Sequence, residues 1–426
     1  MLLAFHLGRV YTLSLAEILA VFARKQIPYT IKALYTEVLL LQTDVDIDLP
    51  SLQKRLGGTI KIIEILDEVP RKKKTDFVSY SVKNYFTSNL LKEKFLKAYS
   101  GKLQFGISLY SLASELKLFG QNKRVGMDIK AKLTETGASC RLVLPEGGGI
   151  SLPSVSVTNN HLLEKGAEID LIVADSKIYI GKTATVQNFA DYGRRDYQRP
   201  VRDIKAGMLP PKVAQIMLNL AAYSPEERQA RGYILDPFCG SGTILQEALL
   251  LNFKAIGSDI SQKAVDDAEK NLNWFRIRYK LAPGLFEIFT SDASELSEKL
   301  EEKKPVAIVT EGSLGPVYVT VPLEKEIEKN FASMAELYVK AFKEFKKILE
   351  PGRSVVIALP AYKIGNKYVT FTGIDKILNL GYDIVELMPN EMVKNYPFLK
   401  VSPRNSIIYD RKDQIVVREI LHFVVK

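Results

Sequence analysis

The chain has few of the residues that build disulfide or metal frameworks. Its 426 residues include two cysteines, Cys140 and Cys239, and three histidines, His6, His161 and His422. We place the two cysteines in different domains, so no disulfide framework is expected, and this cysteine usage favours the cytoplasm. The histidines share no ligand-like spacing, and we therefore predict no metal site.

Long apolar runs are missing as well. No stretch of about 18 apolar residues occurs, so we predict no transmembrane helix. The apolar start, residues 1–5, is too short for a signal peptide and lacks a basic flank.

Positive charge is in excess, since 59 Lys and Arg residues against 49 Asp and Glu give a net charge of +10. That excess suits a polyanionic partner such as nucleic acid, although a basic balance also serves solubility alone.

The chain is organised around residues 233–259, YILDPFCGSGTILQEALLLNFKAIGSD. A short apolar run predicts a buried parallel strand, and in the turn that follows two glycines leave space for a ligand near the backbone. A helix and a second strand are predicted next, and that strand ends at Asp259, where a carboxylate can accept both hydroxyls of a ribose. Because Leu245 fills the third glycine position of the dinucleotide fingerprint, we predict a nucleoside ligand without a bound pyrophosphate. The alternative is a similar turn that no longer binds a ligand. The joint occurrence of DPF, GSG and Asp259 at the end of the second strand disfavours it.

The segment 236–243, DPFCGSGT, resembles the S-adenosylmethionine loop of class I methyltransferases that act on exocyclic amino groups. The resemblance implies S-adenosylmethionine as the cofactor and does not separate DNA from RNA substrates. A helix predicted from residue 207 to 220 carries two prolines in its first turn, which suits a helix start, and its N-terminal dipole can meet the cofactor's carboxylate. Asp292 either accepts from the adenine amino group or caps the helix predicted at 295–300. The residues that we assign to cofactor binding are Pro210, Asp236, Phe238, Gly240, Gly242, Thr243, Asp259, Ile260, Asp292 and Ala293.

The N-terminal half resembles the THUMP-containing half of tRNA guanosine-N2 methyltransferases. The similar segments are FGISLY, MDIKAKLTETGASCRLV, VTNNHLLEKGAEIDLIV and IYIGKTATVQNFADYGRRDYQRP. In that family a ferredoxin-like module precedes the THUMP module, and together they hold the acceptor end of tRNA. The resemblance implies an α/β chain with N-terminal ferredoxin-like and THUMP α+β modules and a C-terminal Rossmann-like class I methyltransferase sheet. The predicted segments are a ferredoxin-like module at 1–69, a THUMP-like RNA-binding module at 77–185, a linker at 186–205 and the methyltransferase domain at 206–426.

Two charged segments have a role that the sequence leaves open. Residues 70–76, PRKKKTD, favour a solvated loop over a phosphate contact. The charges of the predicted linker form interdomain ion pairs, contact RNA, or do both. They are Asp191, Arg194, Arg195, Asp196, Arg199, Arg202 and Asp203.

Amino-group methyltransferases carry a second motif after the fourth strand: an acid or amide, two prolines and an aromatic residue. Its acceptors orient the target amine and its ring stacks on the base, so catalysis rests mostly on positioning. Here the strand predicted at 305–309 is followed by Glu311, Gly312 and Ser313, which we take as the catalytic positions. The proline and the ring are absent, and Tyr318 can replace the ring only if the loop folds back. The chain is thus either an active enzyme with an altered loop or a relic that transfers poorly.

We predict a tRNA methyltransferase that acts on the exocyclic N2 amine of a guanosine, at position 10 of tRNA by the resemblance. The base is expected to be extruded from its helix so that the amine can reach the methyl group. One alternative is a DNA amino-methyltransferase, against which the N-terminal half counts, and another is an RNA-binding protein with lost or weak transfer. Some relatives need a small activating subunit and others do not, so the resemblance leaves that partner open. We predict no membrane partner.

Overall fold

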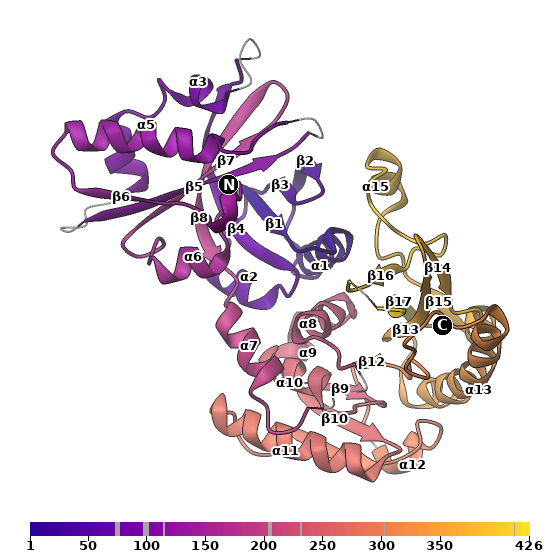
Figure 1. Ribbon diagram of the computed structural model, residues 1–426. Coiled ribbons are helices and arrows are strands. Elements are labelled where there is room, and N and C mark those ends of the chain that lie inside the picture. Colours follow the sequence, from indigo (N-terminus) through magenta and orange to yellow (C-terminus); the bar gives the residue numbers. More distant parts are fainter. Residues whose placement is uncertain are drawn as a thin grey trace. The chain divides into compact units, whose positions relative to one another are not determined.

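The computed structural model describes residues 1–72, 77–96, 102–113, 116–202, 207–230, 232–301, 303–412 and 414–426 (Figure 1). Contacts between these residues divide the chain into two compact units. Each unit combines a β-sheet with helices, which confirms the predicted α/β class. The predicted boundaries between modules stay predictions, and the junction at 205–206, residues 73–76 and Asp203 lie outside the described residues. The first unit comprises Met1–Tyr11, Ile27–Arg55 and Thr59–Phe189, and the second comprises Thr12–Gln26, Leu56–Gly58 and Ala190–Lys426.

The described residues of the first unit form one eight-stranded sheet, in the order β2-β3-β1-β4-β8-β7-β5-β6. Strands β1 to β4 lie in the order β4-β1-β3-β2, with one helix between β1 and β2 and another between β3 and β4. This is the ferredoxin-like arrangement predicted for the first module. Strand β4 also pairs with β8, so one continuous sheet joins the two predicted modules. The strands are β1 Leu2–Leu7, β2 Thr30–Tyr35, β3 Val38–Gln42, β4 Thr59–Pro70, β5 Leu103–Ser111, β6 Cys140–Val143, β7 Gly166–Val173 and β8 Lys177–Val186.

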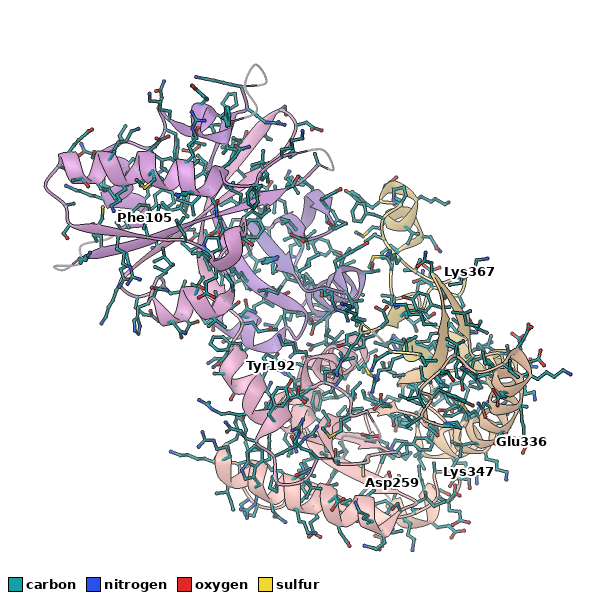
Figure 2. The ribbon with its side chains drawn as sticks, in the orientation of Figure 1. Phe105, Tyr192, Asp259, Glu336, Lys347 and Lys367 are labelled. Atoms are coloured by element: carbon teal, nitrogen blue, oxygen red, sulfur yellow. The ribbon has the colours of Figure 1, made fainter. Side chains whose placement is uncertain are left out.

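The core of the first unit lies between the sheet and helix α5. Val125, Ile129 and Leu133 recur on one face of α5 and pack with the buried side chains of β5, among them Phe105 (Figure 2). Strands β7 and β8 pair antiparallel and form a hairpin around Asp175. The helices are α2 Leu49–Arg55, α3 Val78–Val82, α4 Ser88–Leu90, the π-helical turn η1 Leu91–Phe95, α5 Gln121–Glu135, the 3₁₀ turn η2 Glu146–Gly148 and α6 Ser154–Asn159.

The second unit is a mostly parallel sheet in the order β11-β10-β9-β12-β13-β17-β15, with β14 paired to β13 and β16 to β17. Strand β17 runs antiparallel between β13 and β15, whereas β9 to β13 are parallel. This is the order expected of a class I methyltransferase sheet, and it confirms the Rossmann-like prediction. The strands are β9 Tyr233–Asp236, β10 Lys254–Asp259, β11 Phe286–Thr290, β12 Ala307–Glu311, β13 Ser354–Ile364, β14 Lys367–Thr370, β15 Tyr382–Ile384, β16 Ile407–Tyr409 and β17 Val416–Val425.

Helices pack on both faces of this second sheet. The longest described helix, α13, was not among the predicted elements. It buries Phe331, Tyr338 and Phe342 against Ile357 and Leu359 of β13. The helices are α1 Tyr11–Arg24, α7 Phe189–Tyr197, α8 Pro211–Leu220, α9 Pro225–Gln229, α10 Thr243–Leu250, α11 Gln262–Arg278, α12 Leu296–Leu300, α13 Glu324–Ile348, α14 Ile374–Leu378 and α15 Asn390–Asn395.

Helix α1 belongs to the second unit by its contacts, although it comes from the first residues of the chain. Its buried Glu17 accepts from the backbone N–H groups of Gly57 and Gly58, both at 2.8 Å, and from the side-chain amide of Asn219 at 2.7 Å. Removing residues 1–185 would therefore strip the second unit of a packed helix. Tests of RNA binding consequently need the full chain.

The topology places a site at one edge of the second sheet. From β9 the chain proceeds through β10 and β11 on one side and returns to β12 on the other, so the strand order reverses between β9 and β12. Ligands of open α/β sheets bind beyond the carboxyl ends of the strands at such a point. The carboxyl ends of β9, β10 and β12 carry Asp236, Asp259 and Glu311.

Candidate active site

The glycine-rich turn between β9 and α10 adopts a conformation that needs both of its glycines. Gly240 and Gly242 have φ angles of 50° and 83°, in the left-handed region, and Gly242 is the N-cap of α10. The turn is tied to β10 through the Cys239 N–H, which donates to the Ser258 carbonyl at 2.9 Å. An added Cβ at Gly240 would meet nothing within 4 Å. The backbone at Gly240 therefore borders open space that a ligand can occupy.

Asp259 is held at the end of β10 by two backbone donors. Its Oδ2 accepts from the Gly240 N–H and its Oδ1 from the Ser261 N–H, each at 3.0 Å. The carboxylate thus ties the glycine turn to the start of α11. A carboxylate offers about four lone-pair sites, so both oxygens keep the capacity to accept from ligand hydroxyls. The neighbouring Ile260 is 72% exposed and presents an apolar surface beside the acid.

Asp236 is buried where β9 and β12 lie side by side. Its Oδ1 accepts from the Thr310 hydroxyl at 2.6 Å and from the Phe238 N–H at 3.3 Å. Burial raises the pKa of this carboxyl to about 7, against the opposing effect of the Thr310 hydrogen bond, and the charges of Asp259 and Glu311 raise it further. Asp236 therefore titrates near neutral pH.

We expect the stability of the protein to fall relative to an Asp236→Asn variant as the pH rises from about 4 to about 7. The unfolded carboxyl titrates near 3.9, so between about pH 4 and pH 7 the folded protein binds a proton that the unfolded chain has lost. Stability from this proton is full below about pH 4 and is lost as the pH passes 7. Asparagine keeps the acceptor without titrating. Urea unfolding at several pH values checks this, and parallel profiles for the two proteins would contradict it.

Glu311 ends β12 and forms an ion pair with Arg418 of β17. The Arg418 Nε donates to Oε1 of Glu311, and its Nη2 donates to the carbonyl of Gly207. Burial raises the pKa of Glu311, and the charge of Arg418 opposes that rise. Arg418 was not predicted, although a charged residue in the apolar run VVREILHF was a signal for it. One oxygen of Glu311 is thus engaged by the protein, which leaves Oε2 for another donor.

Positions 312 and 313 are shaped by Tyr338 of α13. An added Cβ at Gly312 would lie 2.4 Å from the Tyr338 hydroxyl oxygen, and that hydroxyl donates to the Ser313 carbonyl at 2.7 Å. A proline at 312 therefore has no room beside Tyr338. Tyr318 does not line the cavity: its hydroxyl accepts from Asn330 at 2.6 Å and its ring packs against Tyr362.

Asp292 lies in a turn beside Asp259. Its Oδ1 accepts from both the N–H and the hydroxyl of Ser294, each at 2.8 Å, and these hydrogen bonds lower its pKa. The Ser291 N–H donates to the Asp259 carbonyl at 3.1 Å, which joins the turn to the end of β10. Helix α12 has Glu295 as its N-cap, with no side-chain cap, so the helix-capping alternative for Asp292 is wrong.

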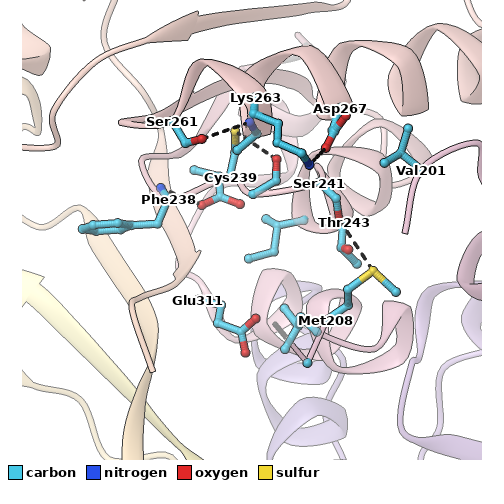
Figure 3. Close-up of a pocket in the computed structure, with 16 residues that line it drawn as sticks. Val201, Met208, Phe238, Cys239, Ser241, Thr243, Ser261, Lys263, Asp267 and Glu311 are labelled. Carbon is cyan, nitrogen blue, oxygen red and sulfur yellow. Dashed lines mark hydrogen bonds and ion pairs between the residues drawn. The ribbon is translucent and has the colours of Figure 1, made fainter. Parts of the chain in front are cut away.

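A cavity of about 240 Å³ opens at these strand ends (Figure 3). Five of the predicted residues line it: Asp236, Phe238, Gly240, Thr243 and Glu311. The other predicted residues do not: Pro210, Gly242, Asp259, Ile260, Asp292, Ala293, Gly312 and Ser313. Pro210 is the N-cap of α8, which begins four residues later than the helix predicted from 207.

Much of the lining was missed, both within the DPFCGSGT segment and in segments without a motif. Met208 and Leu209 precede α8, Ser241 lies between the two glycines, and Lys263 and Asp267 form an ion pair of 2.7 Å on α11. The polar side chains of α11 belong to no ligand motif and were therefore not predicted. The remaining lining residues are Val201, Gly207, Cys239, Ile244, Ser261 and Ala264.

Metal ligands and membrane spans were searched in the described ranges. There, no group of three His, Cys, Asp or Glu side chains is placed to hold a metal ion. The buried His422 is instead hydrogen-bonded to the Ser354 hydroxyl at 2.7 Å, and burial lowers its pKa to about 4. Among the helices that the structure describes, none is long and apolar enough to cross a membrane.

Comparison with known sequences agrees with this geometry. A family model described as DNA methylase matches residues 206–270. The chain is 29% identical over 192 residues to a tRNA (guanine(10)-N2)-dimethyltransferase of Pyrococcus abyssi, which covers 45% of this chain and 46% of the relative. It is 33% identical over 145 residues to the protein of that name from Methanothermobacter thermautotrophicus, covering 34% of this chain and 38% of the relative. The resemblance to tRNA guanine-N2 methyltransferases is confirmed. The chain nevertheless spans only about half the length of the curated relatives it matches.

A solved structure extends the likeness to the whole chain. TrmN from Thermus thermophilus matches with a TM-score of 0.56 and 13% identity, over 100% of this chain and 99% of that one. At so low an identity the match shows the fold alone.

Proposed function

We propose that the chain is an S-adenosylmethionine-dependent tRNA methyltransferase that acts on N2 of a guanosine. One observation carries the proposal. The strand ends around the glycine turn bring Asp236, Asp259 and Glu311 together at the point where the sheet order reverses, and the cavity that opens there is lined by Glu311. Guanosine at position 10 is the target in the names of the two relatives.

The residues present fit the cofactor. The open space at Gly240 admits a ligand against the backbone, and Asp259 can accept from ribose hydroxyls. Ile260 offers an exposed apolar face for an adenine ring, and Asp292 stands beside it as an acceptor for the adenine amino group. Bound there, S-adenosylmethionine would supply a methyl group on a positively charged sulfur.

The chain's own residues would position the amine. With Oε1 of Glu311 engaged by Arg418, its Oε2 is proposed to accept from the N2 amine. The hydrogen bond from Tyr338 to the Ser313 carbonyl fixes the loop that follows. Phe238, the aromatic ring among the described lining residues, would take the stacking role of the missing family aromatic. Catalysis would then consist mostly of orientation.

The proposed partner of the first unit is tRNA. The net charge of +10 and the resemblance of residues 77–185 to a THUMP module support it. We propose that this unit recognises the shape of the tRNA and binds its phosphates, whereas the cavity recognises the target base. The cytoplasm, the compartment predicted from cysteine usage, belongs to the same proposal.

A second candidate is a DNA amino-methyltransferase, which the DNA methylase match at residues 206–270 favours. The shared glycine turn does not separate the two substrates. The ferredoxin-like arrangement of β1 to β4 is the feature that the resemblance associates with tRNA.

The full chain, purified alone, tests the function with tRNA and duplex DNA as competing acceptors. We expect transfer to tRNA, N2-methylated guanosine in nucleoside mass analysis, and binding that weakens steeply with salt because neutralised phosphates release counterions. The number of methyl groups per nucleoside follows from the same analysis. Transfer only to DNA supports the second candidate. Activity that appears only after adding a cell extract identifies a required partner subunit.

A further inference from the structure

Arg199 is a buried cation whose role the proposed function leaves unassigned. Its side chain is only 3% exposed, in the segment that follows α7. One terminal nitrogen, Nη1, donates to the Thr243 hydroxyl at 2.7 Å and, more weakly, to the Ser241 hydroxyl at 3.4 Å. The other, Nη2, faces the Met208 sulfur at 3.1 Å, and Nε has no hydrogen-bond partner among the described residues. Among the described residues, its hydrogen-bond partners are all neutral groups.

The neighbouring Arg195 shows how another buried arginine charge is neutralised by carboxylates in this region. Arg195 is equally buried but forms ion pairs with Asp191 and Glu247. Within the described part of the chain, Arg199 has no carboxylate at ion-pair distance. Burial lowers its pKa, with Arg202 acting in the same direction and Asp196 and Glu247 acting against it. Burying a positive charge without a negative partner destabilises the folded protein. The simplest compensation for Arg199 is therefore a negatively charged ligand group.

The guanidinium lies directly behind the cavity wall. Thr243, Ser241 and Met208, the three residues that it contacts, all line the cavity. Because the Thr243 oxygen accepts from Arg199, the hydrogen of that hydroxyl is free to be donated elsewhere. Thr243 also opens α10, so unpaired backbone N–H groups of the first turn lie at the same place. A ligand anion there would meet a hydroxyl polarised by a full positive charge.

The segment is held rigidly in this position. The side-chain amide of Asn271, buried in α11, donates to the carbonyls of Val201 and Ser241, both at 3.0 Å. Its oxygen accepts from the Val201 N–H at 2.9 Å. The segment that follows Arg199 is therefore tied to the glycine turn through one amide.

We propose that Arg199 is a positioning residue that fixes the carboxylate of the cofactor's methionine part, through the hydroxyl of Thr243. The proposal rests on the proposed function, because it requires S-adenosylmethionine in the cavity. It assigns the Ser241, Thr243 and Met208 side of the cavity to the amino-acid end. The adenosine end would then lie toward Asp259, at the end of β10.

Calorimetry with two ligands tests this without any transfer reaction. S-adenosylhomocysteine carries the carboxylate, and 5′-methylthioadenosine lacks the whole amino-acid part. We expect Arg199→Met to weaken S-adenosylhomocysteine binding by about tenfold or more and to change methylthioadenosine binding by less than about twofold. The control is Arg202→Met, which removes the same charge from an exposed position three residues away and should change neither. Equal losses for both ligands, or no loss for either, would overturn the proposal.

Two further measurements keep the proposal testable if Arg199→Met does not fold. Thr243→Val leaves Arg199 in place and removes the hydroxyl, and we expect the same ligand-selective loss. Wild-type protein should also bind S-adenosylhomocysteine at least tenfold more tightly than its decarboxylated analogue. Equal affinities for these two ligands refute the role of Arg199 while leaving cofactor binding intact. Wild-type protein that binds no adenosyl ligand at all refutes the proposed function itself.

Discussion

Replacing Asp259 with alanine is expected to weaken binding of S-adenosylhomocysteine by about 30- to 1,000-fold. The variant would lose two charge-assisted hydrogen bonds to the ribose hydroxyls, roughly 2–4 kcal/mol. Asp259 also accepts from the N–H groups of Gly240 and Ser261, so the change releases the glycine turn as well. Part of the loss could therefore come from the turn instead of the ribose.

A comparison of two ligands in two proteins separates the loss of ribose hydrogen bonds from the loosening of the glycine turn. Calorimetry compares S-adenosylhomocysteine with its 2′-deoxy analogue in wild type and in Asp259→Ala. If Asp259 binds the ribose, wild type prefers the hydroxylated ligand and the variant loses most of that preference, whereas a loosened turn weakens both ligands equally. Glu269→Ala, which removes an exposed charge from α11, is the matched control and should bind like wild type. An unchanged preference in Asp259→Ala would show that another group binds the ribose.

The parts of the site that follow one another in the chain could be predicted. Strand, glycine turn, helix and second strand occupy 27 consecutive residues, and local patterns give each of them. The ferredoxin-like order and the sheet of the second unit were implied by resemblance and are confirmed. Arg418 illustrates what was missed: it reaches Glu311 from 107 positions away because β13 brings β12 and β17 into one sheet. No local pattern encodes such a pairing.

Gly312 shows how a local reading can miss the packing that constrains a residue. From the sequence alone the glycine marks a degraded motif. In the structure it is the residue that fits under the Tyr338 hydroxyl, and Tyr338 belongs to α13, which was not predicted. The signal was available, because apolar residues recur three or four positions apart along that helix. They are Ile327, Phe331, Met334, Tyr338, Phe342 and Phe345.

The second large effect is expected at Glu311. Glu311→Ala should lower single-turnover transfer to tRNA by about a hundredfold, because the target amine loses a charged acceptor and its orientation. Affinity for S-adenosylhomocysteine should change by less than about threefold, since the residue stands at the end of β12 and not beside Asp259. The alanine also leaves the buried Arg418 without its partner, so lower stability is expected alongside.

Glu311→Gln separates catalysis from that loss of stability. Its side-chain oxygen can still accept from Arg418 Nε, but its amide nitrogen then replaces Oε2, the oxygen proposed to accept from the target amine. We therefore expect a stability close to wild type and a transfer rate as low as that of alanine. A glutamine variant with the wild-type rate would remove Glu311 from the reaction. If neither wild type nor Glu311→Ala transfers methyl groups to tRNA above background, the chain is not a working methyltransferase, and the ion pair with Arg418 is the role that the structure shows for this acid.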